Sequence, residues 1–308
     1  MAREKKSAKQ KMREGNRKFA DKVREYAISH AAPEEDMAMF ADMLGSGRHS
    51  STMLASDLEL RRKSSSFLGQ ALEALRFENP GLQFHFWTLI HARGNTSDRE
   101  PKVELKFLRS LVDRTLRSCD LDGLYILETQ GLGNHPRNGE GRTIMVHAHA
   151  ITWSTARFDA ARVERELSRS DAWRSGVGAP PVIIKPVGNE PGELAYIAYY
   201  LFKAPYDVKM LEKGPHGDRL RPTEKGYRPE FAVRLVELLS QLGLTELVRA
   251  IGRGKAIRTQ WLRRLTNWHR SREKWVEGRL PPFYFDSFWD RYRVKKKQKT
   301  YCRFRIIR

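Results

Sequence analysis

Hydrophobic residues recur at helical spacing in several segments of the chain. In SSSFLGQALEALRF, the residues Leu68, Leu72 and Leu75 fall at i, i+4 and i+7, which would place them on one face of a helix. The segment VELKFLRSLVDRTLRSC has a similar amphipathic pattern. Patterns of this kind predict helices at 64–77, 103–119, 158–175, 191–205, 230–250 and 255–276.

Other segments are rich in aromatic and β-branched residues, which is typical of strands. They lie at 82–92, 123–130, 143–153 and 180–187. The turn-forming string GLGNHPRNGEGR joins the second segment to the third, so we expect a hairpin with a long loop. Prolines at the margins of the fourth segment predict an edge strand, because proline cannot donate to a central ladder. Together these elements predict an α+β fold.

The net charge of the chain indicates which classes of partner it binds. It has 57 Lys and Arg against 37 Asp and Glu, a formal net charge of +20. A charge of this size attracts polyanions, so nucleic acid, the ribosome and an anionic membrane surface are all candidates. No apolar run approaches the roughly 20 residues of a membrane span, and the N-terminal MAREKKSAKQKMR does not resemble a secretory signal. The cysteines Cys119 and Cys302 form no metal motif, so we expect a cytoplasmic protein without membrane attachment.

The string VHAHAITW places His147 and His149 two residues apart in a predicted strand. Side chains at i and i+2 project from the same face of a strand, so both imidazoles would point together. Glu128 in the preceding strand would add a carboxylate across the hairpin. Mixed nitrogen and oxygen ligands suit Mn²⁺ or Mg²⁺ acting on a phosphate oxygen. The alternative is a half-buried histidine pair with a purely structural role.

The string YIAYYLFK places Tyr196, Tyr200 and Lys203 at i, i+4 and i+7 of a predicted helix. At about 100° per residue these three side chains share one side, and the apolar stripe of the helix lies on another. Side chains at i and i+4 are about 5–6 Å apart at Cβ, so both phenols would reach one phosphate. Tyr199 flanks the same side and also has Lys203 four residues later.

These two strings together resemble the HUH endonuclease superfamily of rolling-circle replication initiators. VHAHAITW is similar to the motif of two histidines separated by one residue, and YIAYYLFK resembles the motif of initiators with two tyrosines. The ETQ string resembles the place where many of these proteins carry a third metal ligand, here Glu128, and FHFWTLIHA resembles their first motif. The resemblance covers about residues 65–210 and implies a central antiparallel sheet with flanking helices, similar to an RNA-recognition fold.

The resemblance also implies an activity. His147, His149 and Glu128 would hold Mg²⁺ or Mn²⁺, and Tyr196 or Tyr200 would attack a phosphate of single-stranded origin DNA, with Lys203 stabilising charge. A 5′-phosphotyrosine and a free 3′-hydroxyl would result, and the second tyrosine would later release a circle. A host helicase and polymerase are the implied partners, because the chain has no GxxxxGK[ST] motif of its own.

The ends of the chain lie outside this resemblance. We expect a basic helical or disordered region at 1–64, the HUH endonuclease domain at 65–210, a polar linker at 211–229 and a helical basic DNA-binding region at 230–308. Trp261, Trp268 and Trp275 are seven residues apart and predict a packing stripe. The same predicted helix carries candidate phosphate contacts. They are Arg258, Arg263, Arg264 and Arg270.

Two other functions fit part of the pattern. An HUH transposase or relaxase would use the same active-site residues and differ in the DNA that it cuts. A non-catalytic nucleic-acid-binding protein of RNA-recognition type would instead need aromatic residues on the sheet, for which Phe84, Phe86 and Tyr125 are candidates. That function gives no reason for tyrosines and a lysine beside a histidine pair. Metal-dependent nicking would exclude it.

Overall fold

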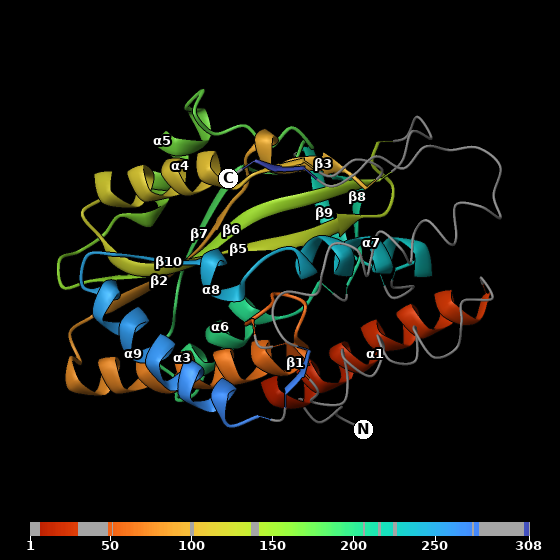
Figure 1. Ribbon diagram of the computed structural model, residues 1–308. Coiled ribbons are helices and arrows are strands. Elements are labelled where there is room, and N and C mark those ends of the chain that lie inside the picture. The colour runs from red at the N-terminus through yellow and green to blue at the C-terminus, as the bar shows by residue number, and fades with distance from the viewer. Residues whose placement is uncertain are drawn as a thin grey trace, which may run out of the picture.

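The computed structural model has an α+β fold, in which helices flank a curled mixed sheet (Figure 1). It describes residues 7–29, 49–50, 52–98, 102–136, 142–205, 207–214, 217–223, 227–272, 274–276 and 305–307. The helices are α1 (Ala8–Ser29), α3 (Leu58–Glu78), η1 (Ala92–Gly94, a 3₁₀ turn), α4 (Leu105–Ser118), α5 (Ala160–Arg169), α6 (Glu193–Phe202), α7 (Pro229–Ser240), α8 (Leu244–Leu247) and α9 (Gly254–Arg270).

The main sheet has the strand order β7-β2-β6-β5-β8-β9, with β10 paired to β5 and β3 paired to β6. Its members are β2 (Gln83–Leu89), β3 (Asn95–Ser97), β5 (Asp122–Leu132), β6 (Thr143–Ser154), β7 (Val182–Pro186), β8 (Lys209–Gly214), β9 (Gly217–Pro222) and β10 (Val248–Ile251). Two short parallel pairs lie outside it. They are β1 (His49–Ser50) with β11 (Lys274–Val276), and β4 (Lys102–Glu104) with β12 (Arg305–Ile307).

The centre of the sheet agrees with the sequence analysis. Strands β5 and β6 form the expected antiparallel hairpin, and β2 pairs antiparallel with β6. Strand β7 lies at the edge, as its prolines predicted. The sheet is mixed rather than wholly antiparallel, because β8 pairs in parallel with the end of β5.

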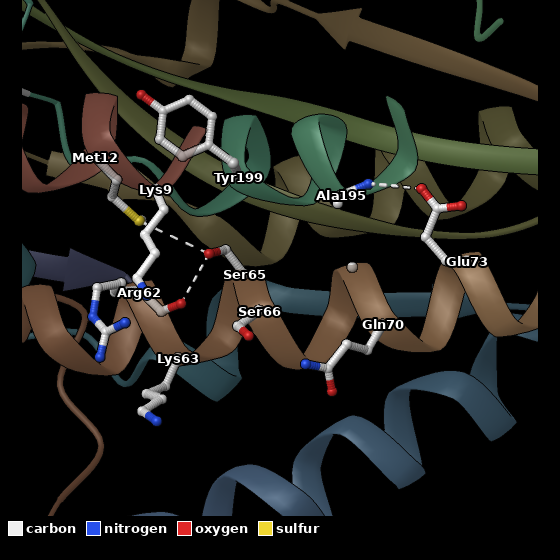
Figure 2. A pocket seen from close by; sticks show the side chains of 11 residues that line it. Lys9, Met12, Arg62, Lys63, Ser65, Ser66, Gln70, Glu73, Ala195 and Tyr199 are labelled. Atoms are coloured by element: carbon white, nitrogen blue, oxygen red, sulfur yellow. Dashed lines mark hydrogen bonds between the residues drawn. The ribbon is translucent and has the colours of Figure 1, made fainter. Parts of the chain in front are cut away.

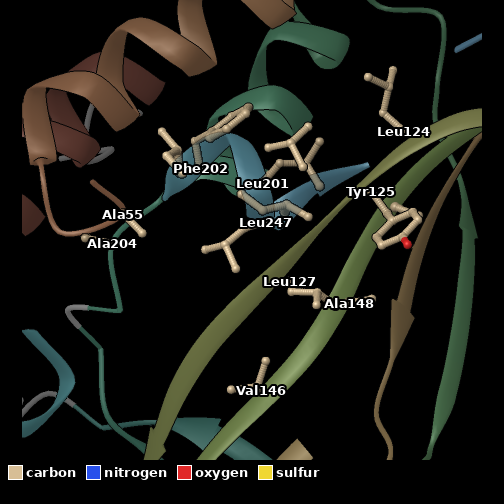
Figure 3. Packing of buried hydrophobic residues seen from close by; sticks show 14 of the residues in the cluster. Ala55, Leu124, Tyr125, Leu127, Val146, Ala148, Leu201, Phe202, Ala204 and Leu247 are labelled. Atoms are coloured by element: carbon tan, nitrogen blue, oxygen red, sulfur yellow. The ribbon is translucent and has the colours of Figure 1, made fainter. Parts of the chain in front are cut away.

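The two faces of the sheet are covered by different helices. In Figure 1, α4 and α5 lie above the sheet, and α3, α6 and α9 lie below it. The side chains of Leu201 and Phe202 in α6 lie close to Leu247 of α8, whereas Tyr125 and Leu127 lie on the other side of β5 (Figure 3). The strands β5 and β6 are therefore buried on both faces, which holds their side chains in fixed positions.

Helix α3 begins six residues before the expected start at 64. The side chain of Asp57 accepts a hydrogen bond of 2.8 Å from Leu60 N and caps the helix at Leu58. The expected boundary at 64 therefore cuts through one helix. Helix α1 also belongs to the main body, because it packs along α7 and buries Met12, Phe19 and Val23.

The expected linker at 211–229 is instead occupied largely by the hairpin of β8 and β9, which extends the sheet beyond β5. Its polar composition reflects exposure of the hairpin, since Glu212, Lys213 and Arg221 face solvent. The length and polarity that predicted a linker are equally compatible with an exposed edge hairpin.

The expected C-terminal region at 230–308 is not separate from the sheet. The predicted helix at 230–250 is divided into α7, α8 and β10, and β10 pairs antiparallel with β5 from Val248 to Ile251. Helix α9 packs on α3, and the ring of Trp261 stacks on Phe202 of α6 at 5.7 Å. Trp261 is buried and Trp268 half-buried, as expected for a packing stripe, whereas Trp275 lies in β11. The basic run 295–299 lies outside the described residues.

Candidate metal centre and active site

The register of the sheet brings the predicted ligands together. Glu128 of β5 lies directly opposite His147 of β6, and His149 lies directly opposite Thr88 of β2. Directly opposed residues of an antiparallel pair project from the same face. His147 and His149 share a face by alternation, so all four side chains point toward α6.

The three predicted ligands form one compact cluster, which we call the metal cluster (Glu128, His147 and His149). His149 Nε2 lies 2.9 Å from Glu128 Oε2 and 3.0 Å from His147 Nε2, and His147 Nε2 lies 3.7 Å from Glu128 Oε2. All three side chains are buried, and their ligand atoms lie within 4.8 Å of one another. A group of this kind could hold a metal ion.

These distances fit the donor set of a small divalent cation. Oxygen or nitrogen ligands at about 2.1 Å in octahedral geometry lie roughly 3 Å from their neighbours, as two of the three pairs do here. Neither oxygen of the buried Glu128 carboxylate accepts a hydrogen bond of good geometry from the described residues. The cluster is therefore a buried anion with two imidazole nitrogens facing it, which is an arrangement that a cation would satisfy.

Electrostatics holds the ligands in metal-binding protonation states. Burial acts to raise the pKa of Glu128, but the Lys203 ammonium and the adjacent His149 and His147 rings together outweigh it and lower the pKa to about 2. Burial, together with the neighbouring His149, lowers the pKa of His147 to about 3. At neutral pH the carboxylate is ionised and the His147 ring is neutral, and these are the forms that bind metals.

The orientation of the His149 ring is set by contacts at its Nδ1 atom and by a neighbouring aromatic ring. Its Nδ1 lies 3.1 Å from Thr88 Oγ1 and 3.4 Å from the backbone oxygen of Trp87. A proton on Nδ1, donated to the Trp87 oxygen, would leave the Nε2 lone pair free for a cation. The ring of Phe86 stacks on His149, with centroids 5.2 Å apart and planes at 25°. Both Phe86 and Thr88 belong to the string FHFWTLIHA, and the register of β2 with β6 places them beside His149, a contact that the sequence analysis did not predict.

Of the two predicted tyrosines, Tyr200 lies against the metal cluster. Its ring centroid is 5.1 Å from that of His149 and 5.4 Å from that of Phe86, with edge-to-face geometry in both cases. Lys203 follows the last residue of α6, and its Nζ lies 3.9 Å from the centre of the Tyr200 ring and 3.8 Å from Glu128 Oε1. The structure therefore brings Tyr200 and Lys203 to the site that the histidines form.

The backbone of Lys203 accepts a hydrogen bond from Arg61, a residue that the sequence analysis did not identify. Burial acts to lower the pKa of Lys203, but the Glu128 carboxylate, the Tyr200 phenol and Asp207 together more than compensate, so the pKa is raised and the ammonium stays charged. The guanidinium of Arg61, which is 1% exposed, donates to the backbone oxygens of Lys203 and Ala55. In sequence Arg61 is one of three consecutive cations, RRK, and nothing distinguishes it from its partly exposed neighbours.

Tyr196 and Tyr199 lie on another side of α6. The ring of Tyr196 is 43% exposed, 5.8 Å from the ring of Tyr199, and 5.4 Å from Lys11 Nζ of α1. Tyr199 is buried and lines a cavity of about 630 Å³ between α1, α3 and α6, across from Ser65 (Figure 2). The prediction that the phenols share one side of the helix is therefore wrong. Tyr200 faces the metal cluster, whereas Tyr196 and Tyr199 contact each other near α1.

The predicted DNA-binding arginines fall into two groups. Arg258 donates to the backbone oxygens of Val248 and Thr245, and Arg264 donates to Gln70 Oε1 of α3. These contacts tie α9 to its neighbours. Arg263 and Arg270 are exposed and remain candidates for phosphate contacts.

Among the described residues, every helix is too short or too polar to span a lipid bilayer. Comparisons of the chain with protein-family models, with curated proteins and with solved structures gave no match.

Proposed function

We propose that this protein is a metal-dependent DNA-nicking and strand-joining enzyme of the rolling-circle initiator type, acting on single-stranded origin DNA. One observation carries the proposal: Tyr200 and Lys203 lie against the buried metal cluster, although they come from a helix more than 50 residues away in the chain. A structural histidine pair would not need a phenol and an ammonium on its open side. The basic charge of the chain, +20, suits a nucleic-acid substrate.

Each residue has a distinct part in this proposal. Glu128, His147 and His149 hold Mg²⁺ or Mn²⁺, which when bound would act as a Lewis acid on a phosphate oxygen. The Tyr200 oxygen attacks the phosphorus and forms the phosphotyrosine bond as the bond to the 3′-oxygen breaks. The phenolic proton passes to water, and the departing 3′-oxygen takes up a proton from water to become a hydroxyl.

Lys203 supports this step through its position. Its ammonium lies over the Tyr200 ring and beside Glu128, so a positive charge is already in place where negative charge develops on the phenol and the phosphate. Arg61 donates to the backbone oxygen of Lys203 and so fixes the end of α6 from which the Lys203 side chain extends.

The exposure of the site suggests how the strand approaches. The metal cluster is 1–5% exposed, whereas Tyr200 is half-buried and Tyr196 is 43% exposed. We therefore expect the DNA to lie along α6 and to reach the cluster past Tyr200. Because Tyr200, and not Tyr196, lies against His149, we assign Tyr200 the first attack.

The test uses a pool of single-stranded oligonucleotides that contains a randomised stretch of about 12 positions, with Mn²⁺ and then with EDTA. A covalent protein–DNA adduct that survives denaturing electrophoresis is expected with Mn²⁺ alone. Tyr200→Phe should abolish the adduct in the first turnover, and Tyr199→Phe, a matched change in the next residue, should leave it. An adduct that persists in Tyr200→Phe would overturn the assignment, and its absence from the wild type would overturn the activity.

A further inference from the structure

The molecule has a second concave surface, which lies on the other side of the sheet from the metal cluster. Two adjoining hollows of about 640 and 480 Å³ lie between α4, α8, β10 and the first turns of α9, and both are lined by Lys106, Arg109 and Arg249. The buried Tyr125 hydroxyl of β5 donates to Asp113 of α4, so Tyr125 projects from the face of β5 that α4 covers. Glu128 lies three positions further along the same strand and faces α6, which places the two sites on opposite faces.

Cations dominate this surface. We call it the α4–β10 basic surface and define it by the six cations that line the two hollows, together with their two carboxylates. The cations are Lys106, Arg109, Arg114, Arg117, Arg249 and Arg258, and the carboxylates are Asp113 and Glu246.

The positive charge of the surface is largely uncompensated. Asp113 accepts from Tyr125 at 2.7 Å and pairs with Arg249 at 3.3 Å. Arg109 donates to the backbone oxygen of Glu246 at 2.6 Å, and Arg258 donates to two backbone oxygens. Neutral carbonyl groups thus fix the positions of these two guanidinium groups without cancelling their charges. Six cations against two carboxylates leave an excess of four positive charges.

The other lining groups indicate which polyanion fits. The polar uncharged lining residues are Ser110, Gln241 and Thr245, and no aromatic ring lines either of these two hollows. Single strands are held largely by stacking of bases on aromatic side chains. Cations, hydroxyl groups and amides without aromatic rings are typical of contacts to the phosphate backbone of a duplex.

We propose that the α4–β10 basic surface binds the phosphate backbone of double-stranded DNA without reading its sequence. Lys106 and Arg117 are eleven residues apart on one helix, a span of about 16 Å. Duplex DNA presents about ten phosphate charges over that length, so several cations contact phosphates at once. The duplex lies on the face opposite the metal cluster and so leaves Tyr200 free for a single strand. This inference stands whether or not the protein cuts DNA.

The test reverses the charge of exposed side chains on α4. Lys106, Arg114 and Arg117 are exposed on α4. The triple variant Lys106→Glu, Arg114→Glu, Arg117→Glu is compared with Lys213→Glu, Arg219→Glu, Arg221→Glu, which changes three exposed cations of the distant β8–β9 hairpin by the same charge. Binding is measured by fluorescence anisotropy with a mixed-sequence duplex of about 20 base pairs, oligo-dT of equal length and vesicles containing phosphatidylserine. Circular dichroism and thermal unfolding check that both variants fold.

We expect the α4 variant to lose at least about tenfold in duplex affinity near 0.1 M salt, with the slope of log K against log salt reduced by about two to three. The hairpin variant should keep most of the affinity and the slope. Equal losses in both variants would show an effect of net charge alone and overturn the proposal. A loss confined to oligo-dT or to vesicles would also overturn it, in favour of a single-strand or a membrane surface. If the α4 variant does not fold, Lys106→Gln, Arg114→Gln, Arg117→Gln is measured with the same expected direction.

Discussion

The Nζ atom of Lys203 lies 3.8 Å from Oε1 of Glu128, across the contact between α6 and β5. Both side chains are more than 90% buried, so each charge depends on the other. This pair connects the helix that carries Tyr200 to the strand that carries the third ligand. The metal cluster and the candidate nucleophile are therefore one electrostatic unit, and the predictions below test its parts separately.

Divalent metal should stabilise the protein through the metal cluster. A ligand at about 100 times its dissociation constant raises the free energy of unfolding by about 2.7 kcal/mol. We expect thermal unfolding in excess Mn²⁺ to shift to a higher temperature than in EDTA. Glu128→Gln should remove most of this shift, and Glu212→Gln, at an exposed carboxylate of β8, should retain it. A wild-type protein with equal unfolding temperatures in Mn²⁺ and EDTA would contradict the metal site.

Arg61 should matter far more than its neighbour Arg62. Arg61→Met leaves the buried backbone oxygens of Ala55 and Lys203 without their donors, which costs about 1–3 kcal/mol for each group. We expect the free energy of unfolding to fall by about 2–6 kcal/mol. Arg62 pairs with Glu59 at a partly exposed position, so Arg62→Met should cost less than about 1 kcal/mol. Urea unfolding measures both variants, and similar losses would argue against the buried role of Arg61.

Gly94 should be intolerant of any side chain. A Cβ atom at this position would lie 1.9 Å from the backbone oxygen of Val146, the residue before His147. Because neither backbone can move without disturbing the sheet, we expect Gly94→Ala to destabilise the fold by about 1–3 kcal/mol or more. At Gly81 a Cβ atom would meet nothing within 4 Å, so Gly81→Ala serves as the control. Unfolding in urea that is unchanged by Gly94→Ala would show that β6 is not packed against η1 in this way.

Acid should weaken the fold through His85. Burial lowers the pKa of His85, whose ring lies 4.9 Å from that of Phe158 on the face away from the metal cluster. In the unfolded chain His85 has the ordinary histidine pKa of about 6.5, so below that pH the unfolded chain binds more protons than the folded protein. The contribution of neutral His85 to the free energy of unfolding is therefore complete above about pH 6.5 and is lost as the pH falls. One such group contributes at most about 1.4 kcal/mol per pH unit. His85→Gln should reduce the dependence of the unfolding free energy on pH between 7 and 5, and parallel curves for the two proteins would contradict this.

Local periodicity predicted the elements that carry the site. The β5–β6 hairpin, the edge strand β7 and helix α6 all lie close to their expected ranges, because each has a strong pattern of its own. The C-terminal elements did not match the prediction, since the strand Val248–Ile251 is a four-residue segment, VRAI, at the end of a helical pattern. Its partner, β5, is more than 100 residues away, and pairing at that distance leaves no local signal.

The sequence alone determined which chemical groups are available: two imidazoles on one strand, a carboxylate on the preceding strand and phenols on a helix that ends at a lysine. Only the tertiary structure decided that Tyr200, rather than Tyr196 or Tyr199, contacts His149, because the packing of α6 on α1 and α3 sets its rotation about its own axis. It likewise selected Arg61 from a run of three cations. Spacing along the chain fixes which side chains share a face, whereas the direction of that face depends on the elements that pack around it.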